Sequence, residues 1–322
     1  MHRILVTTVF AGAVALACTD ADPAPYLPLA EIAEDPGLVH ALVLEDGRKL
    51  AWAEYGDPQG VPLIELHGGG ASHLSGLVYH REARDGGVRI IAVDRPGAGG
   101  STWDPDYSVA GFHEDVRQLA DHLQLDGFVV MGNSNGGMFA VALAHAMPDR
   151  VLGAIPLNPA TPVFDDSLAW ELTPIYHELA GQDPAVIVAG MQATVRQFAE
   201  DPDTARANDP FQQFPVDTEP EIVSIYFKAI ELTPPEVLAH EVQLILDEAG
   251  WGFDIFDVQP RVEFFTGVTE VGTPYNRVWA GKLPDAGIHE TTGGHMGQTS
   301  PATRERLMEC VRALSEGGVC AP

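Results

Sequence analysis

Short apolar runs that alternate with helix-like segments constrain the fold of this chain more than any other feature. Four such runs occur in VPLIELHGGG, VRIIAVD, GFVVMG and VLGAIPLN. Their length and apolar content are typical of strands that are buried on both faces of a sheet. The intervening segments 109–123 and 137–147 have the apolar spacing or the small residues of packed helices. This rhythm predicts an α/β fold with a mostly parallel, doubly wound sheet.

The ends of the pattern and one long interruption indicate the domain organisation. HALVL and KLAWAEYG flank a turn and predict a hairpin before the four runs. Residues 160–256 are helix-like and rich in Asp, Glu and Pro, and the strand pattern resumes with VEFFTG and AGIHETTGGH. SPATRERLMECVRALSE predicts a closing helix that Ser300 could cap. We therefore expect one domain over residues 37–322, with a helical lid at about 160–256 inserted after the sixth strand.

The N-terminal residues have the pattern of an export signal. A mostly apolar run at 4–17 follows an arginine, and small residues precede Cys18. The run is shorter than the ~20 residues that span a bilayer, so we predict a signal peptide at 1–18 and a tether at 19–36. VALAC resembles a bacterial lipobox, in which the cysteine becomes lipidated, and ordinary cleavage just before it is the alternative. Both versions predict an exported protein, either lipid-anchored in the cell envelope or periplasm, or secreted.

Charge and cysteine usage limit the partners. The 46 acidic residues outnumber the 18 Lys and Arg residues and give a net charge of −28. Such a surface repels phosphate backbones, so we expect no nucleic-acid partner, and membrane contact only through a lipid on Cys18. The histidines show no ligand spacing, so no metal site is expected. In an exported chain Cys310 and Cys320 could form a disulfide, and two free thiols are the alternative. The oligomeric state does not follow from the sequence.

The stretch VVMGNSNGGM predicts a nucleophilic serine. Ser134 lies between a predicted strand and a predicted helix, with Gly132 and Gly136 two positions away on either side. A turn that exposes a serine in this way crowds the two backbones, so these positions must be small. The helix N-terminus directs backbone N–H groups, including that of Asn135, toward developing negative charge. A plain loop serine is the alternative interpretation.

Further motifs follow in the chain order that such a serine needs. The glycines of His67-Gly68-Gly69-Gly70 let the backbone approach a substrate, so the N–H of Gly69, or of Gly68, could complete an oxyanion hole with that of Asn135. His295 follows the last predicted strand, where a general base is expected. Its rival His289 lies inside that strand.

The acid of the expected triad is assigned by position. Glu270 is the carboxylate in the loop after VEFFTG, 25 residues before His295, and could orient the imidazole as Asp does elsewhere. Asp165 and Asp166, which follow an earlier strand, are the rival acids. Asp94 and Arg95, after another strand, are expected to brace loops around the site by hydrogen bonds.

These motifs resemble those of the α/β-hydrolase superfamily, in particular proline iminopeptidase-like and esterase-like serine hydrolases. The resemblance lies in LHGGGAS, DRPGAGGS, GNSNGG, WGFDIFDV with FFTGVTEVGTP, and GGHMG, which together span residues 66–297. Three features depart from the common pattern: HGGG replaces His-Gly-x-Pro-Gly, Glu270 replaces Asp, and Asn135 is an uncommon neighbour of the serine. The resemblance implies the fold and a Ser-acid-His machinery without specifying a substrate.

Together the motifs predict an exported hydrolase that cleaves an ester or amide through an acyl-enzyme, without a cofactor. The substrate would be a small molecule or a short peptide. A prolyl aminopeptidase is the first alternative, and a non-catalytic binding lipoprotein on the same scaffold is the second. A perhydrolase or lyase that uses the same triad is a further possibility.

Overall fold

The computed structural model describes residues 29–33, 35–169, 173–207, 214–247 and 249–321. The predicted signal peptide at 1–18, including Cys18, lies outside these residues, as does most of the predicted tether at 19–36. In the described part of the chain, no helix has both the length and the apolar character required to cross a bilayer.

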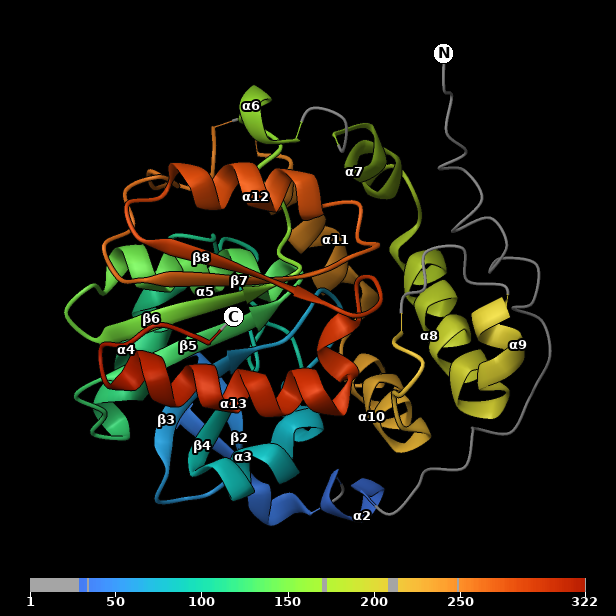
Figure 1. Ribbon diagram of the computed structural model, residues 1–322, viewed down its shortest axis with the longest axis horizontal. Coiled ribbons are helices and arrows are strands. Elements are labelled where there is room, and N and C mark those ends of the chain that lie inside the picture. Colours follow the sequence, from blue (N-terminus) through green and yellow to red (C-terminus); the bar gives the residue numbers. More distant parts are fainter. Residues whose placement is uncertain (1–28, 34, 170–172, 208–213, 248, 322) are drawn as a thin grey trace.

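A single sheet of eight strands forms the centre of the described structure (Figure 1). The strands are β1 (Val39–Val43), β2 (Lys49–Gly56), β3 (Val61–Leu66), β4 (Val88–Val93), β5 (Phe128–Asn133), β6 (Val151–Leu157), β7 (Val262–Gly267) and β8 (Ala286–Thr291). Their order is β1-β2-β4-β3-β5-β6-β7-β8. β1 and β2 form the predicted hairpin, β2 pairs antiparallel with β4, and all later pairings are parallel. The prediction of a mostly parallel, doubly wound sheet is confirmed.

Helices cover both faces of this sheet. They are α3 (His80–Gly86), α4 (His113–His122), α5 (Asn135–Ala146), α12 (Thr273–Lys282) and α13 (Pro301–Ser315), with 3-10 helices η2 (His73–Tyr79) and η3 (Gly297–Thr299). One core cluster joins the sheet to α4, α5 and α12 through Val116, Phe139 and Trp279. A second joins the opposite face to α3 and α13 through Ala83 and Leu307.

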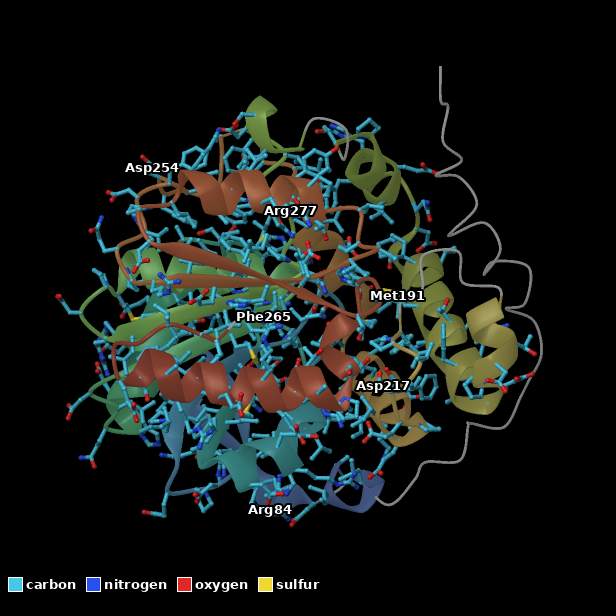
Figure 2. All side chains as sticks on the ribbon, in the orientation of Figure 1. Arg84, Met191, Asp217, Asp254, Phe265 and Arg277 are labelled. Atoms are coloured by element: carbon cyan, nitrogen blue, oxygen red, sulfur yellow. A yellow bond between two sulfur atoms is a disulfide. The ribbon has the colours of Figure 1, made fainter. Side chains whose placement is uncertain are left out.

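The buried strands explain why the apolar runs were readable in the sequence. All six residues of β5 are buried, and its first five positions carry no polar side chain. β7 is buried along its whole length as well, but it includes the polar residues Glu263 and Thr266. Phe265 of β7 is 1% exposed within the molecule, whereas the side chain of Arg84 lies at the outside (Figure 2). Because parallel strands are covered on both sides, their sequences lack the alternation of half-exposed strands.

Between β6 and β7 the described residues form helices. They are α6 (Asp166–Ala169), α7 (Thr173–Ala180), α8 (Pro184–Glu200), α9 (Pro202–Ala207), α10 (Pro220–Glu231) and α11 (Pro235–Ile245). We call α6 to α11 the cap helices; α8 to α10 lie beside the sheet in Figure 1. Two short elements, α2 (Leu29–Ala33) and η1 (Pro36–Leu38), precede β1.

Two local expectations were correct in position but differ in detail. The helix expected over 109–123 is present as α4, but it spans His113–His122, and the residues directly before it form turns. Ser300 is the N-cap residue of α13, but its hydroxyl donates to Oδ2 of Asp217, at 2.8 Å, and not to the helix, which ties this turn to the segment before α10. A tertiary partner has therefore replaced the local cap.

Candidate active site

Ser134 occupies the turn between β5 and α5 in a backbone conformation that few residues adopt. Its φ is 52° and its ψ is −120°, and its N–H donates to the carbonyl of Leu157 at 2.9 Å. A Cβ on Gly132 would overlap the carbonyl of Gly136, and a Cβ on Gly136 would overlap that of Leu66. The two glycines thus permit the strand and helix to crowd around a strained serine.

The glycine-rich loop after β3 lies directly against this serine. A Cβ built on Gly68 would lie 3.7 Å from Cβ of Ser134, and one on Gly69 would lie 2.6 Å from Nδ2 of Asn135. Within the described part of the chain, the backbone N–H groups of Gly69 and Asn135 have no hydrogen-bond acceptor. Two free N–H groups on neighbouring segments beside a serine form a suitable site for a developing oxyanion.

Glu270 and His295 meet in the structure. Glu270 follows β7, His295 follows β8, and Oε2 of Glu270 lies 3.2 Å from Nδ1 of His295. The imidazole is 33% exposed and the carboxylate 14%. Burial opposes the charged form of each group, but their mutual attraction outweighs it: the pKa of His295 is raised and the pKa of Glu270 is lowered. With Nδ1 directed at Glu270, Nε2 is the nitrogen that remains for another partner.

The rival residues Asp165 and His289 have other partners, and the side chain of the third rival, Asp166, is outside the part of the chain that the structure describes. Asp165 accepts hydrogen bonds from both the backbone and the hydroxyl of Ser167. The side chain of Asp166 lies outside the described part of the chain. His289 lies within β8, as expected, and its Nε2 lies 3.0 Å from Oε2 of Glu263.

Asn158, which sequence reasoning missed, links the loops that carry Glu270 and His295. Its Nδ2 donates to the carbonyl of His295 at 2.9 Å, and its Oδ1 accepts from the N–H of Gly267 at 2.8 Å. Its φ is 41°, a left-handed conformation that Asn tolerates better than most residues. The only sequence signal is its place directly after the sixth strand, before Pro159.

Asp94 holds the loops around the site by hydrogen bonds, as expected for a bracing residue. It is fully buried and accepts bonds from the N–H of His73 at 2.7 Å, from Nδ1 of His73 at 2.8 Å and from the N–H of Gly100 at 2.9 Å.

Arg95 is also fully buried and contacts both the glycine loop and the cap helices. Its Nη1 donates to the carbonyl of His67 at 2.5 Å, and its Nη2 donates to that of Gly68 at 3.2 Å. Its Nε lies 2.7 Å from Oε1 of Glu241, a residue of α11 that is itself fully buried. Although burial opposes its charge, Glu241 raises the pKa of Arg95.

In the described residues, one cluster brings metal-ligand atoms within 4.8 Å of one another: Glu263, His289 and Cys320. Their atoms are already engaged. Cys310 and Cys320 form a disulfide, and Nδ1 of His289 lies 2.7 Å from a guanidinium nitrogen of Arg306. The N–H of Cys320 donates to Glu263 at 3.1 Å. The cluster therefore ties the C-terminal segment to β7 and β8.

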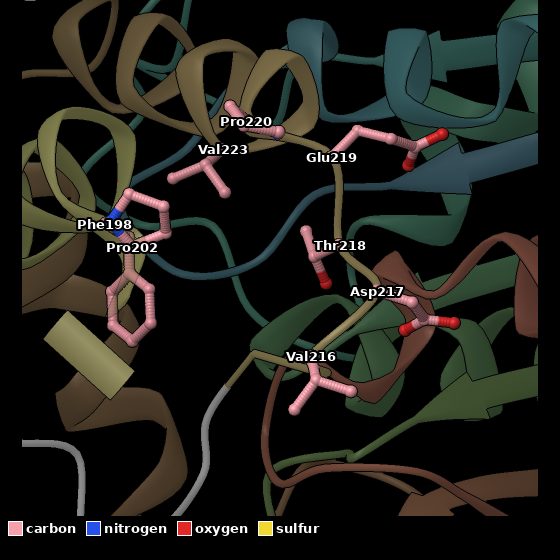
Figure 3. A pocket seen from close by; sticks show the side chains of 8 residues that line it. All are labelled: Phe198, Pro202, Val216, Asp217, Thr218, Glu219, Pro220 and Val223. Carbon is pink, nitrogen blue, oxygen red and sulfur yellow. The ribbon is translucent and has the colours of Figure 1, made fainter. Parts of the chain in front are cut away.

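A pocket of about 330 Å³ opens in the cap helices (Figure 3). Its lining residues are Phe198, Pro202, Val216, Asp217, Thr218, Glu219, Pro220 and Val223. Oγ1 of Thr218 lies 2.7 Å from Oγ1 of Thr299, in η3 just after His295. The pocket is thus built from cap residues, with one wall hydrogen-bonded to the segment that carries the imidazole.

Comparisons with known proteins show the family to which this chain belongs. A family model for the alpha/beta hydrolase fold matches residues 61–235, more than half of the chain. A proline iminopeptidase of Arabidopsis thaliana is 30% identical over 127 residues, covering 35% of this chain and 30% of that protein. A probable proline iminopeptidase of Leptolyngbya boryana is 32% identical over 115 residues, covering 32% of this chain and 33% of that protein. The chain therefore spans about a third of the length of these relatives.

Among solved structures, one from a study of carboxylesterases of the thaumarchaeon Nitrososphaera gargenis is similar, with a TM-score of 0.66 and 18% identity. The alignment covers 86% of this chain and 99% of that one. At this level of identity the likeness concerns the fold.

Proposed function

Because the chain belongs to the α/β-hydrolase family, we propose that it is a serine hydrolase that cleaves an ester or amide bond through an acyl-enzyme. The contact between Glu270 and His295, at 3.2 Å, carries this proposal. It supplies an oriented base at the strand edge where Ser134 occupies a strained, glycine-flanked turn. Base, orienting acid and serine hydroxyl are the parts of a Ser-acid-His triad.

In the proposed reaction, Nε2 of His295 removes the proton from Ser134 as its Oγ attacks the substrate carbonyl. Glu270 keeps the proton on Nδ1 and stabilises the imidazolium that forms. The free N–H groups of Gly69 and Asn135 receive the oxyanion, and each such donor is worth about 10²–10³ in rate. His295 then passes the proton to the leaving group, and water releases the acyl group by the same steps in reverse. No step requires a cofactor.

Ester hydrolysis is the first choice of substrate class, and prolyl aminopeptidase activity is the second. The names of the curated relatives favour the second choice, and such an activity needs a carboxylate that is free to bind the substrate's ammonium group. Glu241 is the cap carboxylate in contact with Asn135, and Arg95 already neutralises it within a fully buried pair. This carboxylate is thus not free to bind an ammonium group, so Glu241 would not be the residue that holds a prolyl substrate.

The export proposal rests on the sequence of residues 1–18. The disulfide between Cys310 and Cys320 supports it, because disulfides persist mainly in oxidising compartments. Lipidation at Cys18 is the finer version of this proposal, and mass spectrometry of the membrane fraction would detect the modified cysteine.

The function is tested by the hydrolysis rates of short p-nitrophenyl esters and of prolyl-p-nitroanilide, measured for wild type and Ser134→Ala. We expect ester cleavage that Ser134→Ala abolishes. Cleavage of the anilide in preference to the esters would favour the aminopeptidase. Equal rates for wild type and Ser134→Ala would contradict the proposed mechanism.

A further inference from the structure

A fully buried ion pair joins cap helix α11 to the loop after β4. Nε and Nη2 of Arg95 lie 2.7 Å and 3.0 Å from the two carboxylate oxygens of Glu241, and both side chains are 0% exposed. The hydroxyl of Tyr107 donates to Oε1 at 3.1 Å. Such a pair has fixed geometry, because a guanidinium and a carboxylate bind in one planar arrangement. It can therefore serve as a reference point for the groups bonded to it.

On one side, the pair fixes the glycine loop. Arg95 donates to the carbonyls of His67 and Gly68. The carbonyl of Gly68 and the N–H of Gly69 belong to one planar peptide unit and point in opposite directions. Because Arg95 holds the carbonyl, the direction of the Gly69 N–H is set as well.

On the other side, the same carboxylate fixes the residue after the serine. Oε2 of Glu241 accepts a hydrogen bond from Nδ2 of Asn135 at 3.1 Å. The Asn135 amide also occupies the space beside Gly69, where a Cβ would lie 2.6 Å from Nδ2 and 2.9 Å from Cδ1 of Leu238. Leu238 belongs to α11 as well. The two segments that carry the free N–H groups are therefore both linked to one cap carboxylate, one through Arg95 and the other through the Asn135 side chain.

We propose that Glu241 of α11 aligns both backbone donors of the oxyanion hole, through Arg95 on the Gly69 side and through the Asn135 side chain on the other. The inference rests on the proposed function, since such alignment matters only if Ser134 performs acyl transfer. Glu241, Arg95 and the Asn135 side chain act as positioning residues that do not touch the substrate. Asn at position 135 is then explained as the donor that meets a cap carboxylate.

The charge balance is consistent with this role. A free carboxylate this close to a developing oxyanion would repel it, whereas a carboxylate paired with Arg95 is neutral overall. The pair thus aligns the donors without adding negative charge beside them.

The test uses two variants and one matched control. Asn135→Ala removes one link while it keeps the backbone N–H and the ion pair. Glu241→Gln removes the carboxylate at the centre. The control is Glu221→Gln, because Glu221 of α10 also forms a two-oxygen ion pair between cap and core, with Arg81 at 2.9 and 3.0 Å. Its partner Arg81 lies on α3, and neither residue belongs to the segments that carry the N–H groups of Gly69 and Asn135.

For each variant, kcat and KM would be measured on a p-nitrophenyl ester, together with the Ki of a trifluoromethyl ketone whose hemiketal oxygen mimics the oxyanion. We expect Asn135→Ala and Glu241→Gln to lower kcat by about 10- to 100-fold, below the full loss of one donor, with little change in KM. Ki should rise by a similar factor, and the acid limb of the pH profile should stay in place because His295 is unchanged. The losses of the double variant should not multiply, since both changes break one connection.

Glu221→Gln should keep wild-type kcat and Ki. If it loses as much as Glu241→Gln, general loosening of the cap explains the effect and the inference is overturned. If wild type hydrolyses the ester but Asn135→Ala keeps its kcat and Ki, the inference fails while the proposed function stands. If wild type neither hydrolyses esters or anilides nor reacts with the ketone, the proposed function itself fails.

Discussion

The Asn158 side chain forms two hydrogen bonds near the site, and the effect of removing them can be worked out from the structure. Asn158→Ala removes the donor to the carbonyl of His295 and the acceptor for the N–H of Gly267. Both backbone groups would be left without a protein partner. Alanine would also have to adopt the φ of 41° that Asn158 has now. Asn158→Gly loses the same two bonds but tolerates that conformation.

The expected loss of unfolding free energy has two parts, one from the unpaired backbone groups and one from the left-handed conformation of residue 158. A buried backbone group left unpaired costs about 1–3 kcal/mol, and because His295 is partly exposed, water can relieve part of that cost. We therefore expect the two groups together to cost about 2–3 kcal/mol. The left-handed conformation adds about 1 kcal/mol for alanine. Asn158→Ala should thus lose about 3–4 kcal/mol of unfolding free energy, and Asn158→Gly slightly less.

Urea unfolding followed by tryptophan fluorescence would measure both losses, and esterase kinetics would show whether His295 has moved. We expect kcat to fall in both variants, because the carbonyl anchored by Asn158 belongs to His295, the proposed general base. A loss below about 1 kcal/mol, or an alanine variant that is more stable than the glycine variant, would refute the reasoning.

Three further predictions concern other parts of the molecule. Glu270 raises the pKa of His295, and the base must be neutral to act, so the acid limb of the kcat/KM profile should lie above the ordinary histidine pKa of about 6.5. In Glu270→Gln only burial would act on the imidazole, so the limb should shift below that pKa and kcat should fall by up to about 10⁴. A limb that does not move would exclude Glu270 as the acid. Gly136→Ala should abolish activity and soluble expression, because its Cβ would overlap the carbonyl at the end of β3; an active, soluble variant would contradict the crowding of the elbow. Replacing Cys310 and Cys320 by alanine should lower the unfolding free energy by about 3 kcal/mol, for a short closed loop, and unchanged urea unfolding would contradict a stabilising disulfide.

The parts of the fold that were readable in the sequence are those set by local pattern. β5 is buried along its whole length, so it appeared as an apolar run that ends only at the turn before Ser134. The glycines around Ser134 were readable because backbone crowding leaves no alternative residue there. Glu270 and His295 could be paired in advance because the carboxyl ends of neighbouring parallel strands meet at one edge of the sheet.

The parts that were not readable depend on contacts between distant residues. Glu241 lies 106 positions from Asn135 and 146 from Arg95, and its own neighbours in α11 carry no signal of either contact. Asn158 likewise binds a residue 137 positions away. Ser300 has the local features of a helix cap, but its hydroxyl donates a hydrogen bond to Asp217 and not to the helix. A buried polar side chain chooses its partner by tertiary geometry, which a single sequence does not encode in any local pattern.

The central claim is that Ser134 is a nucleophile activated by His295 and Glu270. The most direct measurement is mass spectrometry of the intact protein and its peptides after treatment with a fluorophosphonate. The account predicts one covalent adduct per chain, located on Ser134, and none on Ser134→Ala. An unlabelled wild type, or an adduct that persists in Ser134→Ala, would contradict it.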